Sequence, residues 1–390
     1  MRVVHICFCG VYTDGFTYQE NLLAKYQKKN GHEVTVLTGR FCYDPTGKLV
    51  LADAGSFTDV NGVQVIRLKT VGEEKTGQRF FRMKDFLPTL TKLCPEIIFV
   101  HGLAFSDTDR LAEYAAQHPE VRMYVDNHAD FSNSATNWLS KNILHRIIWK
   151  RGAKKLEPYV RRFYGVLPAR VDFLVQMYDL PPEKCSLLVM GADDELAETA
   201  RQEQTVKDTR ARYGLRDDTF LIVTGGKIDV PKIQTLLLMR AVKKLAQERK
   251  DRDLKLIIFG SVEEALKPEF ESLLGPDCIR YIGWIGPKDA YALFAAAQLC
   301  VFPGRHSVYW EEASGTGTPL IVKDWEGTRH VDLGGNVIFL KKDDASEIEQ
   351  ALVSVLYEEG VYQSMKAVAE EKGVSCFSYR NIARMSIEDQ

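Results

Sequence analysis

One stretch constrains the fold of this chain more than any other. Residues 303–322 read P-G-R-H-S-V-Y-W-E-E-A-S-G-T-G-T-P-L-I-V, with an apolar strand expected just before them and a second apolar strand at their end. Strand, polar loop, short helix, Gly-rich turn and strand is the plan of an α/β unit, which binds ligands at the carboxyl ends of its strands. If Glu311 and Glu312 open the helix, the loop before them offers backbone N–H groups to an anion. A glutamate beside such a loop can accept hydrogen bonds from vicinal hydroxyls.

Further strand–helix–strand units fill both halves of the chain, and such units imply parallel sheets. In the first half we expect strands at 2–8, 33–37, 63–68, 96–100, 122–125, 165–167 and 185–189, and helices at 17–29, 79–93 and 110–117. In the second half we expect strands at 220–224, 254–259, 278–282, 298–302, 320–322 and 334–340, and helices at 233–248, 291–298, 345–358 and 361–372.

The length of the chain favours two domains, because 390 residues are too many for one hydrophobic core. We expect an α/β domain at 1–200 and a second at 201–372, joined by a charged and weakly patterned passage at 194–214. Residues 373–390 are expected to form a last helix that returns to the first domain.

Composition excludes several classes of protein. Lys+Arg 51 against Asp+Glu 53 gives a net charge of −2, so no global field attracts nucleic acid. No run is long and apolar enough to cross a membrane, and the polar residues after the first strand do not fit a signal-peptide cleavage site. The eight cysteines lack metal-ligand spacing. We therefore expect reduced thiols and a cytoplasmic location.

Titratable side chains follow several of the expected strands. His101 and His128 end two successive strands; either alone is as easily a loop histidine, but together, at the edge where α/β ligands bind, they favour a site. Lys227 and Lys232 stand between a strand and a long helix, where two ammonium groups and helix N–H groups suit a diphosphate. The alternative for these lysines is an ordinary surface loop. Gly15 is either part of a tight turn or a point of close approach to a phosphate or sugar.

Residues 137–164 form a basic segment with an apolar side. The basic residues are Lys141, Arg146, Lys150, Arg151, Lys154, Lys155, Arg161 and Arg162, and the apolar side consists of Ile143, Leu144, Ile147 and Ile148. One interpretation is a solvated helix face. The other is an interfacial helix that contacts anionic lipid or a phosphate-bearing acceptor, which would give the protein a peripheral position on the inner face of the membrane.

The order of these motifs resembles a known family. G-G-K-x4-K, an apolar strand ending in Gly, Y-I-G-W-I and V-F-P-G-x-H-S-x-x-W-E-E-A-x-x-x-G-T-P are similar to the donor half of family 4 glycosyltransferases, which have the GT-B fold. G-V-Y-T-D-G-F-T-Y-Q-E-N-L-L, N-G-H-E-V-T-V-L-T, D-N-H-A-D and M-G-A-D resemble the other half. The resemblance implies two Rossmann-like domains whose parallel sheets face across a cleft. It also implies a nucleotide sugar held mostly by the second domain, and transfer with retention at the anomeric carbon without a metal.

The resemblance also implies roles for individual residues. Lys227, where the family usually has arginine, and Lys232 would neutralise the diphosphate, and His128 would lie near the transferred sugar as the third catalytic residue. Glu312 would bind the ribose hydroxyls. The other donor-binding positions lie in glycine turns, in the base-contacting segment and in the loop whose backbone amides contact sugar and phosphates: Gly15, Gly226, Trp284, Ile285, His306, Ser307, Val308 and Tyr309.

One position departs from the family's pattern. The family has a glutamate eight residues before Glu312, and here that position is Gly304. The contact with the donor sugar that this glutamate usually makes is therefore missing. Glu311 is a candidate replacement, but adjacent residues on a helix point about 100° apart, so Glu312 remains the expected ribose ligand.

The implied function is transfer of a hexosyl or N-acetylhexosaminyl group from a nucleotide sugar to a saccharide or lipid-linked saccharide, as in surface polysaccharide or glycoconjugate synthesis. UDP is the commonest nucleotide in the family, and no cofactor is expected beside the donor. The missing glutamate leaves open a non-catalytic, degenerate GT-B protein that binds a saccharide or partners an active transferase. A GT-B epimerase would need acid/base carboxylates near the donor sugar, and no such pair is evident. A dehydrogenase is disfavoured because no G-x-G-x-x-G follows the first strand.

Overall fold

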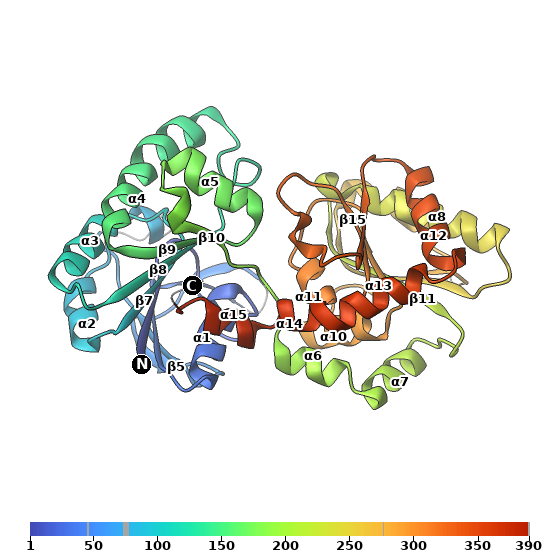
Figure 1. The fold of residues 1–390 in the computed structure, drawn as a ribbon, viewed down its shortest axis with the longest axis horizontal. Helices are drawn as coiled ribbons and strands as arrows, with labels where there is room; N and C mark the ends of the chain where they lie inside the picture. The colour runs from blue at the N-terminus through green and yellow to red at the C-terminus, as the bar shows by residue number, and fades with distance from the viewer. Residues whose placement is uncertain (45–46, 73–77, 276, 389–390) are drawn as a thin grey trace. The chain divides into compact units, whose positions relative to one another are not determined.

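The protein is described by a computed structural model that covers residues 1–44, 47–72, 78–275 and 277–388 (Figure 1). Backbone packing divides the chain into two units. Unit 1 consists of Met1–Met190 and Tyr379–Gln390, and unit 2 of Gly191–Ser378. The division falls before the expected boundary at residue 200, because α6 (Asp194–Ala200) packs on α10 (Pro287–Ala296) of unit 2.

Unit 1 is built on a sheet with the spatial strand order β10-β9-β8-β7-β1-β2-β6-β5, parallel throughout except for the pairing of β5 with β6. Its strands are β1 (Arg2–Cys7), β2 (Glu33–Thr38), β5 (Gly55–Thr58), β6 (Gln64–Arg67), β7 (Ile97–His101), β8 (Arg122–Asn127), β9 (Val160–Gly165) and β10 (Cys185–Leu187). A separate hairpin pairs β3 (Phe41–Tyr43) with β4 (Leu49–Leu51). Its helices are α1 (Gln19–Lys29), α2 (Phe86–Leu93), α3 (Thr108–Gln117), α4 (Lys150–Leu156), α5 (Pro168–Tyr178) and α15 (Tyr379–Met385), with π-helical turns at Ser140–Trp149.

Alternation along the strands gives this sheet two apolar faces. Along β1, Val4 and Ile6 belong to the core beneath α2, α3, α4 and α5, whereas Val3 and Cys7 belong to the core beneath α1 and α15. Side chains of a strand point alternately to the two faces, so an unbroken apolar run is typical of a strand buried on both sides. Figure 1 shows α15 beside α1, and the two helices pack on each other.

Unit 2 is built on a parallel sheet with the order β13-β12-β11-β14-β15-β16. Its strands are β11 (Phe220–Ile228), β12 (Leu254–Val262), β13 (Ile279–Tyr281), β14 (Leu299–Phe302), β15 (Leu320–Lys323) and β16 (Val337–Leu340). Its helices besides α6 and α10 are α7 (Glu203–Arg212), α8 (Gln234–Glu248), α9 (Lys267–Leu273), α11 (Tyr309–Gly315), α12 (Ala345–Tyr357), α13 (Val361–Val368) and α14 (Val374–Cys376). The chain runs outward from β11 to β13, then returns to place β14 on the other side of β11, which is the Rossmann order.

Several expected elements differ from the structure; the strand expected at 165–167, for example, is β9, which ends at Gly165. The helix expected at 79–93 starts only at Phe86, after a short 3₁₀ turn. The basic segment 137–164 is not one helix: it ends as a helix at Leu156, and Arg161 and Arg162 lie on β9. Residues 194–214 are not a loose passage, since they form α6 and α7. The strand expected at 220–224 continues to Ile228 because Gly225, Gly226 and Lys227 pair with β12.

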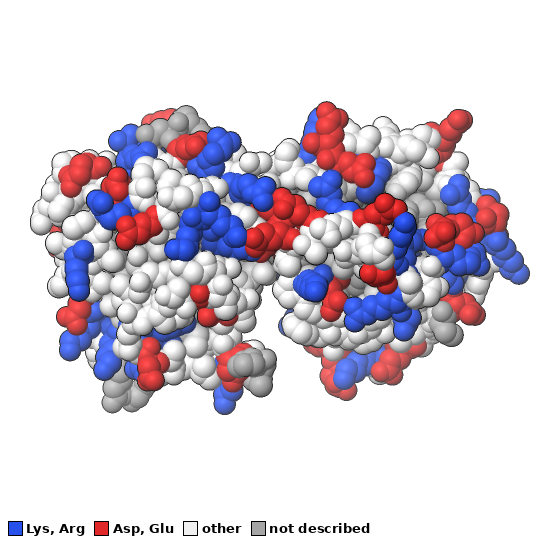
Figure 2. Space-filling view, turned by 90° about the horizontal axis from the view of Figure 1, so that it is seen from below, with Lys and Arg blue, Asp and Glu red and all other residues white. Residues whose placement is uncertain are grey.

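The surface is mixed in charge and the cysteines are reduced. Figure 2 shows Lys and Arg side chains interspersed with Asp and Glu side chains on the visible face of both units, in keeping with a net charge of −2. All eight cysteines are free thiols. Within the described ranges, no helix combines the length and the apolar character needed to cross a bilayer.

Candidate functional site

The main candidate site lies where the order of strands in unit 2 reverses. β11 and β14 are neighbours, but the chain leaves them toward opposite edges of the sheet. Such a switch point leaves a crevice at the carboxyl ends of the two strands, and α/β proteins bind ligands there. Lys227 lies at the end of β11, Lys232 closes the 3₁₀ turn Val230–Lys232 that follows it, and the loop 303–308 follows β14.

Gly226 brings three of the expected site residues together. Its φ of +111° is a conformation that L side chains rarely adopt. A Cβ built on it would lie 3.4 Å from the ring of Tyr309 and 3.8 Å from Lys232 Nζ. The Tyr309 ring packs in turn on Phe259, with ring centroids 5.3 Å apart. The first residue of α11 and the ammonium group of Lys232 therefore meet at the end of β11.

Two further cations lie near Lys232. Burial lowers the pKa of Lys232; Asp229 opposes that shift, and the charges of Lys227 and Arg305 add to it. Lys227 is 68% exposed and its Nζ lies 3.3 Å from Asp229 Oδ2. Three like charges near one another disfavour the protonated state of Lys232, so a bound anion would be stabilised here. Arg305 belongs to this group, and the sequence analysis did not single it out.

Gly304, which stands at the position of the missing glutamate, is closely packed. A Cβ there would lie 3.0 Å from Lys232 Cα and 3.2 Å from both Lys232 Cβ and Gln234 Oε1. A longer side chain would therefore have to displace the segment that carries Lys232. Gln234 Oε1 is buried and has no hydrogen-bond partner among the described residues. The residues around position 304 therefore leave no room for a glutamate side chain in this arrangement.

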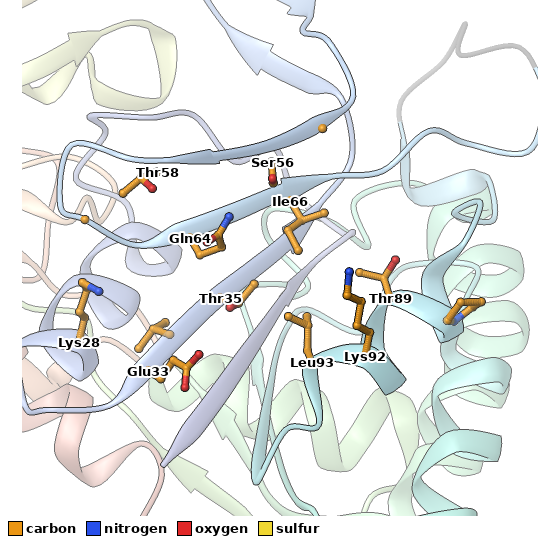
Figure 3. Close-up of a pocket in the computed structure, with 14 residues that line it drawn as sticks. Lys28, Glu33, Thr35, Ser56, Thr58, Gln64, Ile66, Thr89, Lys92 and Leu93 are labelled. Atoms are coloured by element: carbon orange, nitrogen blue, oxygen red, sulfur yellow. The ribbon is translucent and has the colours of Figure 1, made fainter.

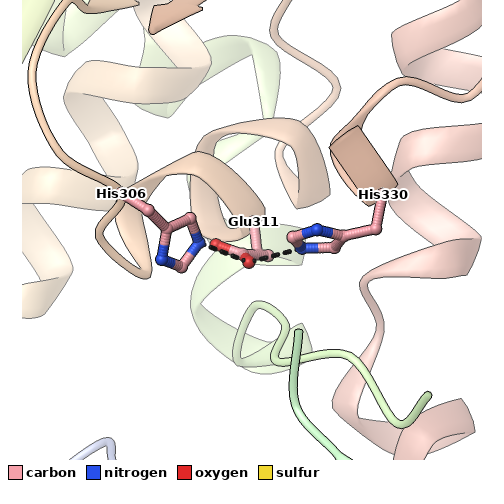
Figure 4. A group of neighbouring side chains, drawn as sticks. All are labelled: His306, Glu311 and His330. Carbon is pink, nitrogen blue, oxygen red and sulfur yellow. Dashed lines mark hydrogen bonds and ion pairs between the residues drawn. The ribbon is translucent and has the colours of Figure 1, made fainter. Parts of the chain in front are cut away.

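Glu311 does not replace the missing glutamate, because its carboxylate is bound by two histidines. Its Oε1 accepts hydrogen bonds from His306 Nε2 and His330 Nε2, each at 2.8 Å, and Figure 4 shows the two imidazoles approaching it from opposite sides. Burial raises the pKa of Glu311, but the two histidines outweigh it and bring that pKa down to about 2. His306 comes from the loop after β14 and His330 from the 3₁₀ turn Arg329–Val331, so the carboxylate ties two loops together.

The same three side chains are of the types that bind metals. One ligand atom from each of His306, Glu311 and His330 lies within 4.8 Å of the others. The 2.8 Å separations are hydrogen-bond lengths. A metal-bound histidine usually donates its other N–H to an acceptor, and His330 Nδ1 has no partner among the described residues. The hydrogen-bonded arrangement accounts for this geometry better than a metal site does.

The other expected donor-binding residues of unit 2 lie on α11, just before it, or after β13. Glu312 is buried, and burial followed by the charges of Glu311 and Asp193 raises its pKa well above the usual value. Ser307 and Val308 accept the first backbone hydrogen bonds of α11 through their carbonyl oxygens. Trp284 is 77% exposed and follows β13. Ile285, next to it, is half-buried.

In unit 1, the structure joins the two expected histidines through Asp126, the first residue of the D-N-H-A-D motif, for which the sequence predicted no role. Asp126, buried at the end of β8, accepts a hydrogen bond from His101 Nδ1 at 2.9 Å and lies 3.5 Å from His128 Nε2. Burial raises the pKa of Asp126, but His101 and His128 lower it further than burial raises it. His101 Nε2 lies 2.8 Å from Nδ1 of His5. His128, 39% exposed, is the member of this network that solvent reaches most easily.

The glycine turn at Gly15 and a cavity of unit 1 have no described residue in common. Gly15 has φ +75° and no atom within 4 Å of an added Cβ, as both of its interpretations allow. A cavity of about 680 Å³ lies between β2, β5, β6 and α2 (Figure 3). Its lining includes Thr35, Gln64 and Lys92 and none of the expected site residues.

A family model and several curated proteins match parts of the chain. The model of the family "Glycosyl transferases group 1" matches residues 219–358. A D-inositol 3-phosphate glycosyltransferase of Nocardioides sp. is 27% identical over 233 residues, which are 55% of this chain and 50% of the relative. Its counterpart in Corynebacterium diphtheriae is 24% identical over 214 residues, 52% of this chain and 50% of the relative. The chain thus matches about half the length of these relatives.

Solved structures show the fold over nearly the whole chain. Sucrose-phosphate synthase of Thermosynechococcus elongatus superposes with a TM-score of 0.66 at 16% identity, covering 98% of this chain and 96% of that one. A glycosyltransferase of Rickettsia africae gives 0.67 at 14% identity with coverage of 98% and 96%. Anabaena HepE in complex with UDP gives 0.65 at 12% identity with coverage of 99% and 98%. With its two Rossmann-like units the chain has the fold of these structures, and its residues 219–358 match the model of the glycosyl transferases group 1 family.

Proposed function

We propose that this protein is a retaining glycosyltransferase that moves a hexosyl or N-acetylhexosaminyl group from a UDP-sugar to a saccharide or lipid-linked saccharide. The observation that carries the proposal is the group of Lys227, Lys232 and Arg305 at the switch point of unit 2. Three of the similar structures, all of Anabaena HepE, are complexes with UDP, with UDP and glucose, or with UDP-glucose. Surface polysaccharide or glycoconjugate synthesis is the process to which such a transfer would belong.

The chemistry of transfer explains why cations are needed there. Breaking the bond between the anomeric carbon and the diphosphate leaves negative charge on the departing nucleotide. Ammonium groups fixed where that charge develops stabilise the transition state more than the ground state. Lys232 is suited to this role because it is partly desolvated and because Lys227 and Arg305 repel its positive charge. A bound diphosphate would offset this repulsion and favour the protonated form of Lys232.

The remaining assignments follow the positions of the side chains. Glu312 would accept hydrogen bonds from the ribose hydroxyls, which would favour its charged form and lower its raised pKa. Trp284 and Ile285 would contact the base, and Gly226 would let the backbone approach the phosphates. In unit 1, Asp126 would hold His128 with Nε2–H directed at the carboxylate, leaving Nδ1 as an acceptor toward the sugar.

Two experiments on one sample separate this function from its alternatives. We expect a UDP-sugar to raise the melting temperature by about 5 °C at 100 times its Kd, more than GDP- or ADP-sugars do. We also expect slow release of UDP without an acceptor, and a product of unchanged anomeric configuration by NMR once an acceptor is supplied. Saccharide binding without nucleotide binding would favour the non-catalytic alternative, and formation of an isomeric nucleotide sugar would favour an epimerase.

We further propose that the segment around α4 contacts the membrane surface, which would suit a lipid-linked acceptor. Trp138, Leu139, Ile147 and Ile148 are 70%, 59%, 57% and 47% exposed, although large apolar side chains are usually buried. They lie among the basic residues of the segment, and this combination is typical of interfacial helices. A solvated face would not need exposed tryptophan and isoleucine.

Replacing Trp138 and Ile147 together with serine should weaken sedimentation with phosphatidylglycerol-containing vesicles by at least about tenfold, because two buried apolar side chains are lost from the interface. Val60, 72% exposed and outside the segment, provides the control: Val60→Ser should sediment as the unmodified protein does. If the unmodified protein binds anionic and neutral vesicles equally weakly, the segment is only a solvated face.

A further inference from the structure

A pocket of unit 2 shares Arg305 with the cation group and extends from β14 toward β15 and β16. It has a volume of about 380 Å³, and its polar lining consists of Gln234, Arg305, Lys323, Asp324, Trp325 and Asp343. These residues come from the start of α8 and from the carboxyl ends of β14, β15 and β16, which are adjacent in the sheet. The volume suits a small organic molecule, and the position is one where α/β folds bind ligands.

The wall of this pocket contains the ring of Trp325 and two buried polar atoms that lack partners in the described part of the chain. The Arg305 guanidinium lies 5.4 Å from the ring centroid of Trp325. Trp325 Nε1 and Gln234 Oε1 are buried and have no hydrogen-bond partner among the described residues. A buried donor and a buried acceptor without partners are costly, and a molecule that offers both kinds of group would relieve both costs.

The charges of the pocket disfavour another phosphate. Two cations, Arg305 and Lys323, face two carboxylates, Asp324 and Asp343. Lys323 Nζ lies 2.6 Å from Asp343 Oδ1, and Asp324 accepts a hydrogen bond at 2.9 Å from Arg329 Nε. The lining therefore sums to no net charge, and its carboxylates would repel an anion. A neutral molecule with several hydroxyls can instead donate to the carboxylates and the amide oxygen and accept from lysine, arginine and indole.

We propose that this pocket binds a pyranose ring, with Trp325 against one face of the sugar and with Gln234, Asp343 and Lys323 contacting its hydroxyls. The inference rests on the proposed function for the source of the sugar, either the glycosyl group of the nucleotide donor or a free saccharide such as the acceptor. Gln234 also has a role connected with position 304. Its side-chain oxygen lies 3.2 Å from where a Cβ of Gly304 would be, so it supplies an acceptor close to the position of the missing glutamate.

Calorimetric titration of the full-length protein tests this proposal. The ligands are UDP, a panel of UDP-hexoses and UDP-N-acetylhexosamines, and the corresponding methyl glycosides with and without UDP. The variants are Trp325→Leu, Gln234→Leu and, in case the first does not fold, Asp343→Asn. Trp138→Leu, a change at a tryptophan of unit 1 that is 70% exposed, is the matched control. Thermal unfolding of each variant without ligand shows whether it is folded.

We expect Trp325→Leu and Gln234→Leu each to lose about tenfold in affinity for the sugar-bearing ligand while the affinity for UDP stays unchanged. Loss of the extra affinity of a UDP-sugar over UDP would identify the donor's glycosyl group, and loss of methyl glycoside binding would identify a free saccharide. The proposal is overturned if folded variants bind every sugar as the unmodified protein does, or if no sugar binds at all. Sugar binding that depends on Trp325 without any UDP binding would overturn the proposed transferase instead.

Discussion

Replacing Lys232 with alanine is expected to lower kcat/KM for sugar transfer by about 10²–10³-fold, the usual cost of removing one group that stabilises developing charge. The unliganded protein should meanwhile keep its melting temperature or gain slightly. The reason is that the pKa of Lys232 is lowered by burial and by the neighbouring charges of Lys227 and Arg305, so its charge is unfavourable in the empty site. A loss of activity with a gain in stability is the signature of a functional charge.

Substitutions of two other lysines serve as comparisons for Lys232→Ala. Lys227 is 68% exposed and already lies 3.3 Å from Asp229, so solvent screens it and Lys227→Ala should cost less than about tenfold. Lys244 lies on α8 beyond the site, with its Nζ 2.9 Å from Glu349, and Lys244→Ala should leave transfer unchanged. The order of effects should therefore be Lys232, then Lys227, then Lys244.

The measurement is steady-state transfer together with the thermal shift induced by UDP. For Lys232→Ala the shift should shrink, because the diphosphate loses its most desolvated partner. Near-normal turnover by this variant would refute the diphosphate role. A large fall in melting temperature without ligand would show that Lys232 is a structural residue.

The sequence was most informative where side chains act through their immediate neighbours in the chain. The mostly apolar runs of β1 and β14 predict strands because both faces of a central parallel strand are buried. The same rule cannot find β3, β4 and β5, which are short and partly exposed. The helix expected at 79–93 is wrong over its first part because propensity alone does not show that residues before Phe86 are held by β-bridge pairing of Thr70 with Met83.

The candidate site was predictable only as a set of positions. Lys227, Lys232 and the loop 303–308 could be named because each follows a strand, and parallel strands bring their carboxyl ends to one edge. What each residue contacts could not be named. Arg305 looked like any loop cation, and the partner of Glu311 at His330 is nineteen residues away. Hydrogen bonds between separate loops depend on the complete fold, and spacing in the sequence carries no sign of them.

Replacing Glu311 with glutamine is expected to lower the free energy of unfolding at pH 7 by about 3 kcal/mol, since a pKa held at about 2 instead of 4.5 corresponds to that amount. The physical cause is the loss of a buried charge that both imidazoles face. The amide oxygen of glutamine can accept hydrogen bonds from the two imidazoles, but it carries no negative charge. The amide N–H₂ group would face the Nε2 atoms of His306 and His330, which donate hydrogen bonds, so it would have no acceptor there. Chemical denaturation at pH 7 measures this difference.

The pH dependence has a definite sign. The pKa of Glu311 is lowered in the folded protein, so its contribution is complete above pH 4.5, where the unfolded chain is also ionised, and fades as pH falls toward 2. The difference in stability between the unmodified protein and Glu311→Gln should therefore shrink as pH falls from 4.5 toward 2. A difference that does not change over this window would mean that packing, and not charge, makes Glu311 important.

Glu312 provides a control with the opposite sign one residue away. It is buried like Glu311, but its pKa is raised, first by burial and then by the charges of Glu311 and Asp193. An acid with a raised pKa destabilises the fold while it is charged, so Glu312→Gln should leave the stability at pH 7 unchanged or increase it. The same change should abolish the thermal shift given by UDP if Glu312 binds the ribose. Equal losses of stability from the two substitutions would contradict the assignment of Glu311 to the histidines and of Glu312 to the ligand. Both carboxylates would then stabilise the fold in the same way.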